Sequence, residues 1–181
     1  MTSTMPTSPT TALLSAVPPK IGGPFASYTF TATPVGGGIP TTVTCPSPTN
    51  CPMKGLLPST KYDVSVVATT ASGTKTPASA PLDLSMPAPT APALTAATAT
   101  GPTQGAATAA PPTTGGPWTS YTFTATPLGG GAPIVVQSAT PDATFNGAKP
   151  GTTYTVSVVA SGPNGPSPAS NTLDFTTPSL G

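Results

Sequence analysis

Three ionisable residue types are missing from this 181-residue chain, which contains no Arg, no His and no Glu. The absence of His excludes His-based general bases, Ser–His triads and His metal ligands. Five Lys and four Asp make only 5% of the residues charged, whereas typical domains have about 25%. With a net charge of only +1, the chain has no strongly basic surface that would attract nucleic acid or an anionic membrane.

Long apolar runs and leader-like segments are also missing. No stretch approaches the roughly 18 apolar residues that indicate a membrane span, so no membrane insertion is predicted. Residues 1–17 have neither a basic start nor a sustained apolar run, so no signal peptide is visible. A processed product or a fragment of a longer protein would lack one equally. No window combines helical periodicity with capping residues, so no long helix is predicted.

Carboxylate chemistry is limited to four Asp residues, Asp63, Asp83, Asp142 and Asp174. Asp83 and Asp174 occupy equivalent places in two similar stretches, which favours an outward strand position over one half of a catalytic pair. No Asp-x-Asp cluster suits calcium, and no phosphate-binding glycine loop occurs. The sequence therefore predicts no enzyme, and no catalytic, cofactor or metal site.

The chain contains the same pattern twice. The motif Gly-Gly-Pro-x-x-Ser-Tyr-Thr-Phe-Thr-Ala-Thr-Pro at 22–34 returns at 115–127, and Tyr-x-Val-Ser-Val-Val-Ala at 62–68 returns at 154–160. A repeat of about 90 residues is the size of one small domain, so two copies of one module are predicted. We expect domains at 1–86 and 93–178, joined by a stiff, extended proline-rich linker at 87–92. The first repeat looks short at its N-terminus, which a cut near a domain edge would explain.

Strand patterns dominate both repeats. Tyr28, Phe30 and Ala32 alternate with threonines, which is typical of a half-buried strand. The 28 Pro and 19 Gly cluster between such runs, where turns belong. About seven short strands per repeat indicate an all-β sandwich or barrel. The expected strands are 1–7, 11–17, 25–34, 40–45, 51–55, 60–69 and 79–86 in the first repeat, and 93–100, 104–110, 118–127, 133–138, 143–147, 152–161 and 170–177 in the second.

The order of motifs resembles the fibronectin type III module. Both repeats carry a corner of the type Gly-Leu-x-Pro-Gly-Thr-x-Tyr leading into Tyr-x-Val-x-Val-x-Ala, at 55–68 and 147–160. The segment 110–121 is similar to the family's Pro-Pro, Gly-Gly and Tyr stretch, and 164–170 to its Gly-x-x-Ser-x-x-Ser loop. The resemblance implies two tandem fibronectin type III-like β-sandwiches, with an immunoglobulin-like variant as the alternative. It also implies that Tyr62 and Tyr154 form structural tyrosine corners, whose hydroxyls bond to the backbone upstream.

The chain departs from the family at the second strand. The Trp that the family often carries before the Pro-Pro pair is replaced by Ala and Val at 16–17 and by two Ala at 109–110. Phe25 and Trp118, at the start of the following strand, are the expected substitutes for its bulk. Ala148 stands where Leu56 provides the corner Leu in the first repeat.

The one reactive feature is the pair Cys45 and Cys51, which closes a small loop between two strands of the first repeat only. We predict a disulfide, which implies an oxidising compartment; two free thiols are the alternative.

The surface points to an extracellular structural protein. Thr, Ser and Pro tracts such as 2–11 and 110–114 suit O-linked glycans, whereas no Asn-x-Ser/Thr site exists. We expect a non-enzymatic spacer or subunit of a fibre, wall or appendage, partnered by other copies or neighbouring modules. One alternative is an adhesion module that binds glycan or protein at loops 36–40, 71–76 or 161–167. Another is a set of spacer repeats in a larger secreted enzyme or a viral surface protein.

Overall fold

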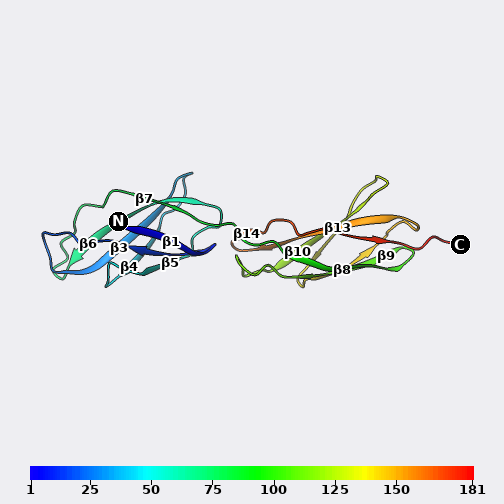
Figure 1. Cartoon of the computed structure of the whole chain (residues 1–181), viewed down its shortest axis with the longest axis horizontal. Helices are drawn as coiled ribbons and strands as arrows, with labels where there is room; N and C mark the ends of the chain where they lie inside the picture. Colours follow the sequence, from blue (N-terminus) through cyan, green and yellow to red (C-terminus); the bar gives the residue numbers. More distant parts are fainter. The chain divides into compact units, whose positions relative to one another are not determined.

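The structure is a computed structural model that describes all residues from Met1 to Gly181. It divides into two compact units, Met1–Ala88 and Pro89–Gly181, here named module 1 and module 2. Figure 1 colours module 1 from blue to green and module 2 from green to red. The division falls inside the segment 87–92 that the sequence marks as a linker.

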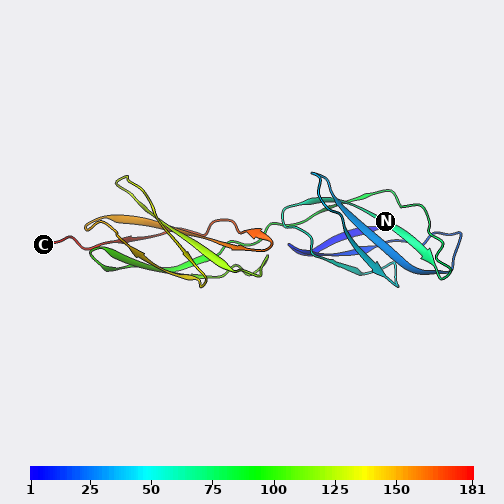
Figure 2. The same cartoon turned by 180° about the vertical axis from the view of Figure 1, so that it is seen from behind.

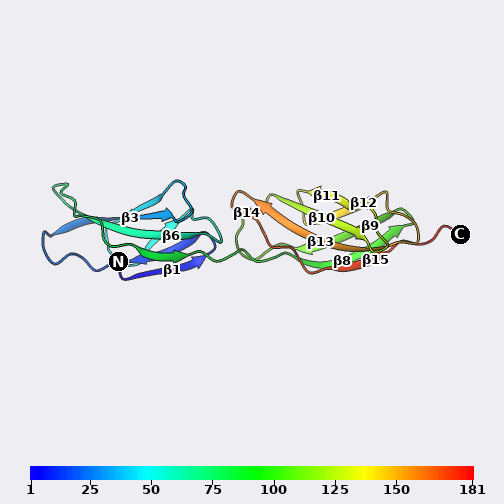
Figure 3. The same cartoon turned by 90° about the horizontal axis from the view of Figure 1, so that it is seen from above.

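Module 1 is a sandwich of two antiparallel sheets. One sheet has the order β1-β2-β5 and the other the order β4-β3-β6-β7. In Figure 3, β3 and β6 run side by side along the length of module 1. The strands are β1 (Ser3–Ser8), β2 (Thr11–Ser15), β3 (Phe25–Pro34), β4 (Thr41–Cys45), β5 (Cys51–Lys54), β6 (Lys61–Thr70) and β7 (Leu82–Ser85).

Module 2 repeats this plan. Its sheets are β12-β9-β8 and β11-β10-β13, the latter extended by β14 and β15, which both pair with β13. The strands are β8 (Ala93–Gly101), β9 (Gln104–Ala110), β10 (Ser120–Pro127), β11 (Ile134–Ser138), β12 (Asp142–Asn146), β13 (Thr153–Gly162), β14 (Gly165–Pro166) and β15 (Leu173–Thr176). Figure 2 shows from behind that both modules consist of strands and loops without a helix. The structure accordingly contains no helix of the length and apolarity needed to cross a bilayer.

Each expected strand is present, and the all-β tandem sandwich is confirmed. The largest differences are in the last strand of each module, expected at 79–86 and 170–177 and observed as Leu82–Ser85 and Leu173–Thr176. Before these strands, a serine replaces regular pairing. The Ser170 hydroxyl accepts a hydrogen bond from the Val158 N–H at 2.9 Å while its own N–H donates to the Val158 carbonyl, and Ser79 makes the same two contacts with Val66. The short strand β14 was not expected from the sequence.

Alternation along the strands separates the core from the surface in both modules. In β3, Tyr28, Phe30 and Ala32 are buried, while the intervening threonines lie on the outer face. The predicted substitutes for the missing Trp, Phe25 and Trp118, are partly buried and pack against their respective cores. The Trp118 Nε1–H also donates to the Pro112 carbonyl at 3.3 Å. Each module therefore has a hydrophobic core of its own.

Candidate functional site

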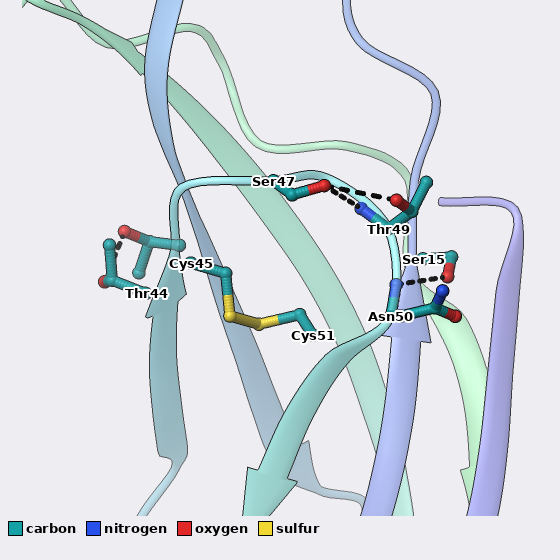
Figure 4. The surroundings of a disulfide bond; sticks show 8 residues. Ser15, Thr44, Cys45, Ser47, Thr49, Asn50 and Cys51 are labelled. Carbon is teal, nitrogen blue, oxygen red and sulfur yellow. Dashed lines mark hydrogen bonds between the residues drawn. A yellow bond between two sulfur atoms is a disulfide. The ribbon is translucent and has the colours of Figure 1, made fainter.

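The disulfide is present in module 1 and joins its two sheets. Cys45 ends β4 in one sheet and Cys51 begins β5 in the other, with a Cα–Cα distance of 6.0 Å and a sequence separation of 6. Figure 4 shows the bond between the ends of these strands. Cys51 is buried at 1% exposure, whereas Cys45 is only partly buried. The predicted disulfide is confirmed, and it closes one end of the sandwich covalently.

Hydrogen bonds shape the loop that the disulfide closes. The Ser47 hydroxyl bonds to the Thr49 hydroxyl at 3.1 Å and accepts from the Thr49 N–H, and the Asn50 N–H donates to the Ser15 hydroxyl at 3.0 Å (Figure 4). Asn50 has a positive φ of 53°, which Asn tolerates better than most residues. In module 2, Ser138 and Thr140 form a similar hydroxyl turn, but Ser138 stands at the register position of Cys45 and the loop is shorter. The hydroxyl contact therefore recurs in both modules, whereas the covalent bond is specific to module 1.

The two tyrosines sit at equivalent corners. The Leu57 N–H donates to the Tyr62 hydroxyl at 2.9 Å, and the Lys149 N–H donates to the Tyr154 hydroxyl at 2.8 Å. Both rings are buried at 2% exposure. Each hydroxyl satisfies a backbone N–H five residues upstream, which is the contact expected of a tyrosine corner. The geometry therefore gives both side chains a structural position.

Some structural residues were missed at the sequence level. Thr177 is 1% exposed, and its hydroxyl donates to the Lys149 carbonyl at 2.6 Å while accepting from the Thr152 N–H. The Asn171 side chain accepts from the Leu94 N–H at 2.8 Å and donates to its carbonyl at 3.3 Å. Neither residue has a counterpart of its type in module 1, where Met86 and Ala80 stand instead. A search restricted to repeated motifs therefore could not find them.

The carboxylates do not form a cluster that could hold a metal. Nowhere do three or more His, Cys, Asp or Glu side chains lie close enough together to bind one ion. Asp83 lies directly opposite Asp63 on β6, and both are exposed. Asp174 lies opposite Thr155, whose hydroxyl donates to it at 2.7 Å. Asp142 is exposed on β12, where it lies opposite Thr108 of β9 and not beside another Asp. The equivalent positions 83 and 174 are thus outward strand positions.

The three loops that the sequence suggests as adhesion sites differ in what they expose. Loop 36–40 lies beside a hollow of about 600 Å³ and exposes Ile39 at 90%. Loop 71–76 is closed by hydroxyl contacts, including Thr70 to Ser72 at 2.9 Å. In loop 161–167, the Ser167 hydroxyl accepts from the Ala160 N–H at 3.0 Å and is buried. Only the first of these loops presents large apolar side chains.

The fibronectin type III domain model matches residues 1–85. The match covers nearly all of module 1, and module 2 has the same sheet order and the same corner. No curated protein is significantly similar to the chain in sequence.

A solved structure with two such domains has a fold similar to that of the whole chain. A two-domain fibronectin type III segment of chicken tenascin is 19% identical, with a TM-score of 0.60 and coverage of 97% of both chains. The FN1–FN3 segment of chicken CNTN1 is 20% identical over 98% of this chain and 65% of that one, with a TM-score of 0.45. The tenascin comparison supports the tandem fold alone. Domains of this family are typically non-enzymatic extracellular modules.

Proposed function

We propose that the chain is a structural or spacer module of an extracellular or cell-surface assembly, such as a fibre, wall or appendage. The observation that carries this proposal is that only 5% of the residues are charged, while many of the exposed positions are Thr, Ser or Pro. A surface with so little charge is poorly protected against association. It suits a protein that packs beside other modules or carries sugars. The disulfide adds support, because such bonds persist in oxidising compartments.

O-linked glycans on exposed hydroxyls are part of this proposal. In the tract 2–11, which forms edge strand β1 and its turn, Thr2, Ser3 and Thr7 are exposed. In the disulfide loop, Ser47 lies between two prolines and Thr49 follows the second of them, and both residues are exposed. Thr4 and Thr7 are poorer acceptors than Thr2 and Ser3, because the Thr4 hydroxyl donates to the Asp83 carbonyl at 2.8 Å and the Thr7 hydroxyl donates to the Thr11 carbonyl at 3.2 Å. The partners in this proposal are other copies of the chain or neighbouring modules.

Surface labelling of intact source cells tests the location. A membrane-impermeant amine reagent should label the exposed Lys20, Lys54 and Lys75 without permeabilisation, while a cytosolic marker stays unlabelled. Peptide mapping of the labelled protein should then find hexose or pentose on peptides that contain the exposed hydroxyls. Labelling only after permeabilisation would contradict the proposed location.

A binding module is the second candidate, and one observation favours it. Val35, Ile39 and Leu57 are 61%, 90% and 53% exposed around loop 36–40 of module 1. In module 2 the positions of Ile39 and Leu57 are taken by Ala132 and Lys149. Such an apolar tip suits adhesion to protein or to the apolar face of a sugar. Ile39→Asp should abolish retention on isolated source matrix if adhesion is the function, and should leave retention unchanged if the chain is a spacer.

A further inference from the structure

Most edge strands of the two modules are protected against pairing with another chain. An open edge presents unpaired backbone N–H and C=O groups, and natural proteins block such edges with Pro, charge, bulges or very short strands. β1 has Pro6 and a shift of register, β8 has shifts of register, and β14 is only 2 residues long. The other protected edges each carry a charged residue: Lys54 on β5, Asp83 on β7, Asp142 on β12 and Asp174 on β15.

The edges β4 and β11 have none of these features. They hold equivalent places in the two modules, pair with one neighbour without a shift of register, and contain neither Pro nor a charged residue. β11 is the more apolar of the two, with the sequence Ile-Val-Val-Gln-Ser against Thr-Thr-Val-Thr-Cys in β4. Val135 on β11 is 58% exposed, and Thr42 stands at the equivalent position of β4. Of the two unprotected edges, β11 therefore gains more from being covered.

The hydrogen-bond pattern of the sheet shows which backbone groups of β11 point outward. The Leu128 N–H donates to the Thr153 carbonyl, and in an antiparallel ladder the hydrogen-bonded pairs recur at every second residue. The even-numbered residues of β10 therefore bond to β13, and its odd-numbered residues bond to β11. Because Val136 lies opposite an odd-numbered residue of β10, its backbone bonds to that strand. The N–H and C=O groups of Val135 and Gln137 consequently point away from the sheet, and no loop backbone bonds to them.

These outward groups fit a second copy of the same strand. Two antiparallel copies of β11 centred on Val136 place Val135 of each copy opposite Gln137 of the other, so that both are hydrogen-bonded pairs. Within the strand, centring on Val135 or on Gln137 instead leaves only one such pair. Pairing cannot extend fully beyond the start of the strand, because the next outward residue is Pro133, which has no N–H. The edge is therefore self-complementary about Val136.

We propose that β11 of module 2 pairs with β11 of a second copy of this chain, antiparallel and centred on Val136, so that one sheet continues across two molecules. The two Val136 side chains face each other across the pair, which is a favourable cross-strand contact, and no charge opposes the approach. Such a short contact is weak by itself and gains from repetition in an assembly. The inference rests on the proposed function and deepens it by naming the partner as a second copy.

Concentration-dependent association of the purified full chain is the direct test. We expect sedimentation to show a monomer–dimer equilibrium that shifts to dimer towards millimolar concentration. Amide exchange should slow at Val135 and Gln137 as the concentration rises, because these N–H groups gain partners only in the dimer, and should stay constant at Thr42 and Thr44 of β4. A chain that remains monomeric at millimolar concentration, with unchanged exchange at all four amides, would overturn the proposal.

Proline substitution at the edge tests the proposed hydrogen bonds. Gln137→Pro removes an outward N–H that does not bond to β10, and Pro is tolerated on an edge strand in this orientation, so the fold should be kept. Dimerisation should weaken about tenfold, because the symmetric pair loses this bond twice. Thr44→Pro makes the same change at the equivalent position of β4 and should leave dimerisation unchanged. Equal weakening by both variants would mean that β11 pairs with β4, and self-pairing of β11 would be wrong.

A charged edge tests the contact without changing the backbone. Val135→Lys introduces two like charges into each dimer, so dimerisation should weaken about tenfold or more at low salt and partly recover at high salt. Thr42→Lys is the matched control on β4 and should have no effect. If neither β11 variant alters the association, the copies meet elsewhere and the assignment of β11 is wrong. These measurements use the purified chain, so their failure is distinct from a failure of the extracellular location, which surface labelling of source cells tests.

Discussion

Module 1 and module 2 build the same sandwich around different core side chains. Where module 1 uses long aliphatic residues, module 2 pairs small residues with aromatic ones, so larger side chains at two positions partly offset the volume lost at the other two. Cores tolerate such coordinated exchanges better than single ones. The exchanges, in register, are Leu14 for Ala107, Met53 for Phe145, Leu56 for Ala148 and Leu84 for Phe175.

The aromatic side chains of module 2 are placed in contact with one another. The ring of Phe175 stacks on Phe145 at a centroid distance of 5.9 Å and on Tyr154 at 5.3 Å. Module 1 has no such stack, and its sheets are instead joined by the disulfide of Cys45 and Cys51. The comparison teaches that strand order and the tyrosine corner define the fold, whereas the means of filling and closing the sandwich can differ.

The largest expected effect comes from Gly105, the one glycine whose space is taken by an aromatic ring of the core. A Cβ at this position would lie 2.5 Å from Phe175 Cζ. Gly105→Ala should therefore destabilise module 2 by about 3 kcal/mol, the upper part of the usual range for overpacking. Trp118 is the single Trp of the chain and lies in module 2, so its fluorescence during denaturation reports this module.

A compensating exchange sharpens this prediction. Module 1 has Ala12 and Leu84 at the two equivalent positions. Adding Phe175→Leu to Gly105→Ala recreates that pair in module 2 and should recover most of the lost stability. A double variant no more stable than Gly105→Ala alone would show that the two cores are not interchangeable in this way.

Removal of the disulfide should act on module 1 alone. The Cys45→Ala and Cys51→Ala double variant should cost about 2 kcal/mol, because a short closed loop restricts the unfolded chain by roughly this amount. The variant also matches Ala143 of module 2 at the second position. Far-UV circular dichroism should show an earlier transition for part of the signal, with the Trp118 transition unmoved. A shift of the Trp118 transition would mean that the modules do not unfold separately.

The tyrosine corners should contribute equally. Tyr62→Phe and Tyr154→Phe each leave one backbone N–H without its partner, and each should cost about 1 kcal/mol or more. Backbone amide exchange should rise at Leu57 in one variant and at Lys149 in the other. An unchanged unfolding midpoint in either variant would remove the stabilising role assigned to that hydroxyl.

The smallest effect concerns the like-charged pair on the outer face of module 1. Asp63 and Asp83 are directly opposed, whereas module 2 has Thr155 opposite Asp174. Like charges opposed across strands are unfavourable, so Asp63→Thr should stabilise module 1 by about 0.5 kcal/mol. The gain should shrink in high salt. A loss of stability would indicate that the carboxylate of Asp63 makes a favourable contact.

Most of the fold was predictable because local and repeated signals agree. Alternation in β3 and β6, glycine-rich turns and the corner motif mark the strands and predict their sheets. Spacing alone also predicts the bond between Cys45 and Cys51. The sequence did not reveal that Pro89 and Pro92 are buried in module 2. A proline-rich composition predicts an extended segment, but it does not indicate which surface that segment contacts. The two hydrogen bonds between the Asn171 side chain and the Leu94 backbone could not be predicted either, because they join residues 77 apart in sequence.

The intact mass of the protein from its natural source, measured with and without alkylation of free thiols, tests the central claim of an extracellular structural module most directly. We predict a mass above the 17.5 kDa of the bare chain, falling in sugar-sized steps on deglycosylation. We also predict no alkylation of the unfolded, unreduced protein, because both cysteines are paired. A bare 17.5 kDa chain with two alkylated cysteines would contradict the account and place the protein in a reducing compartment.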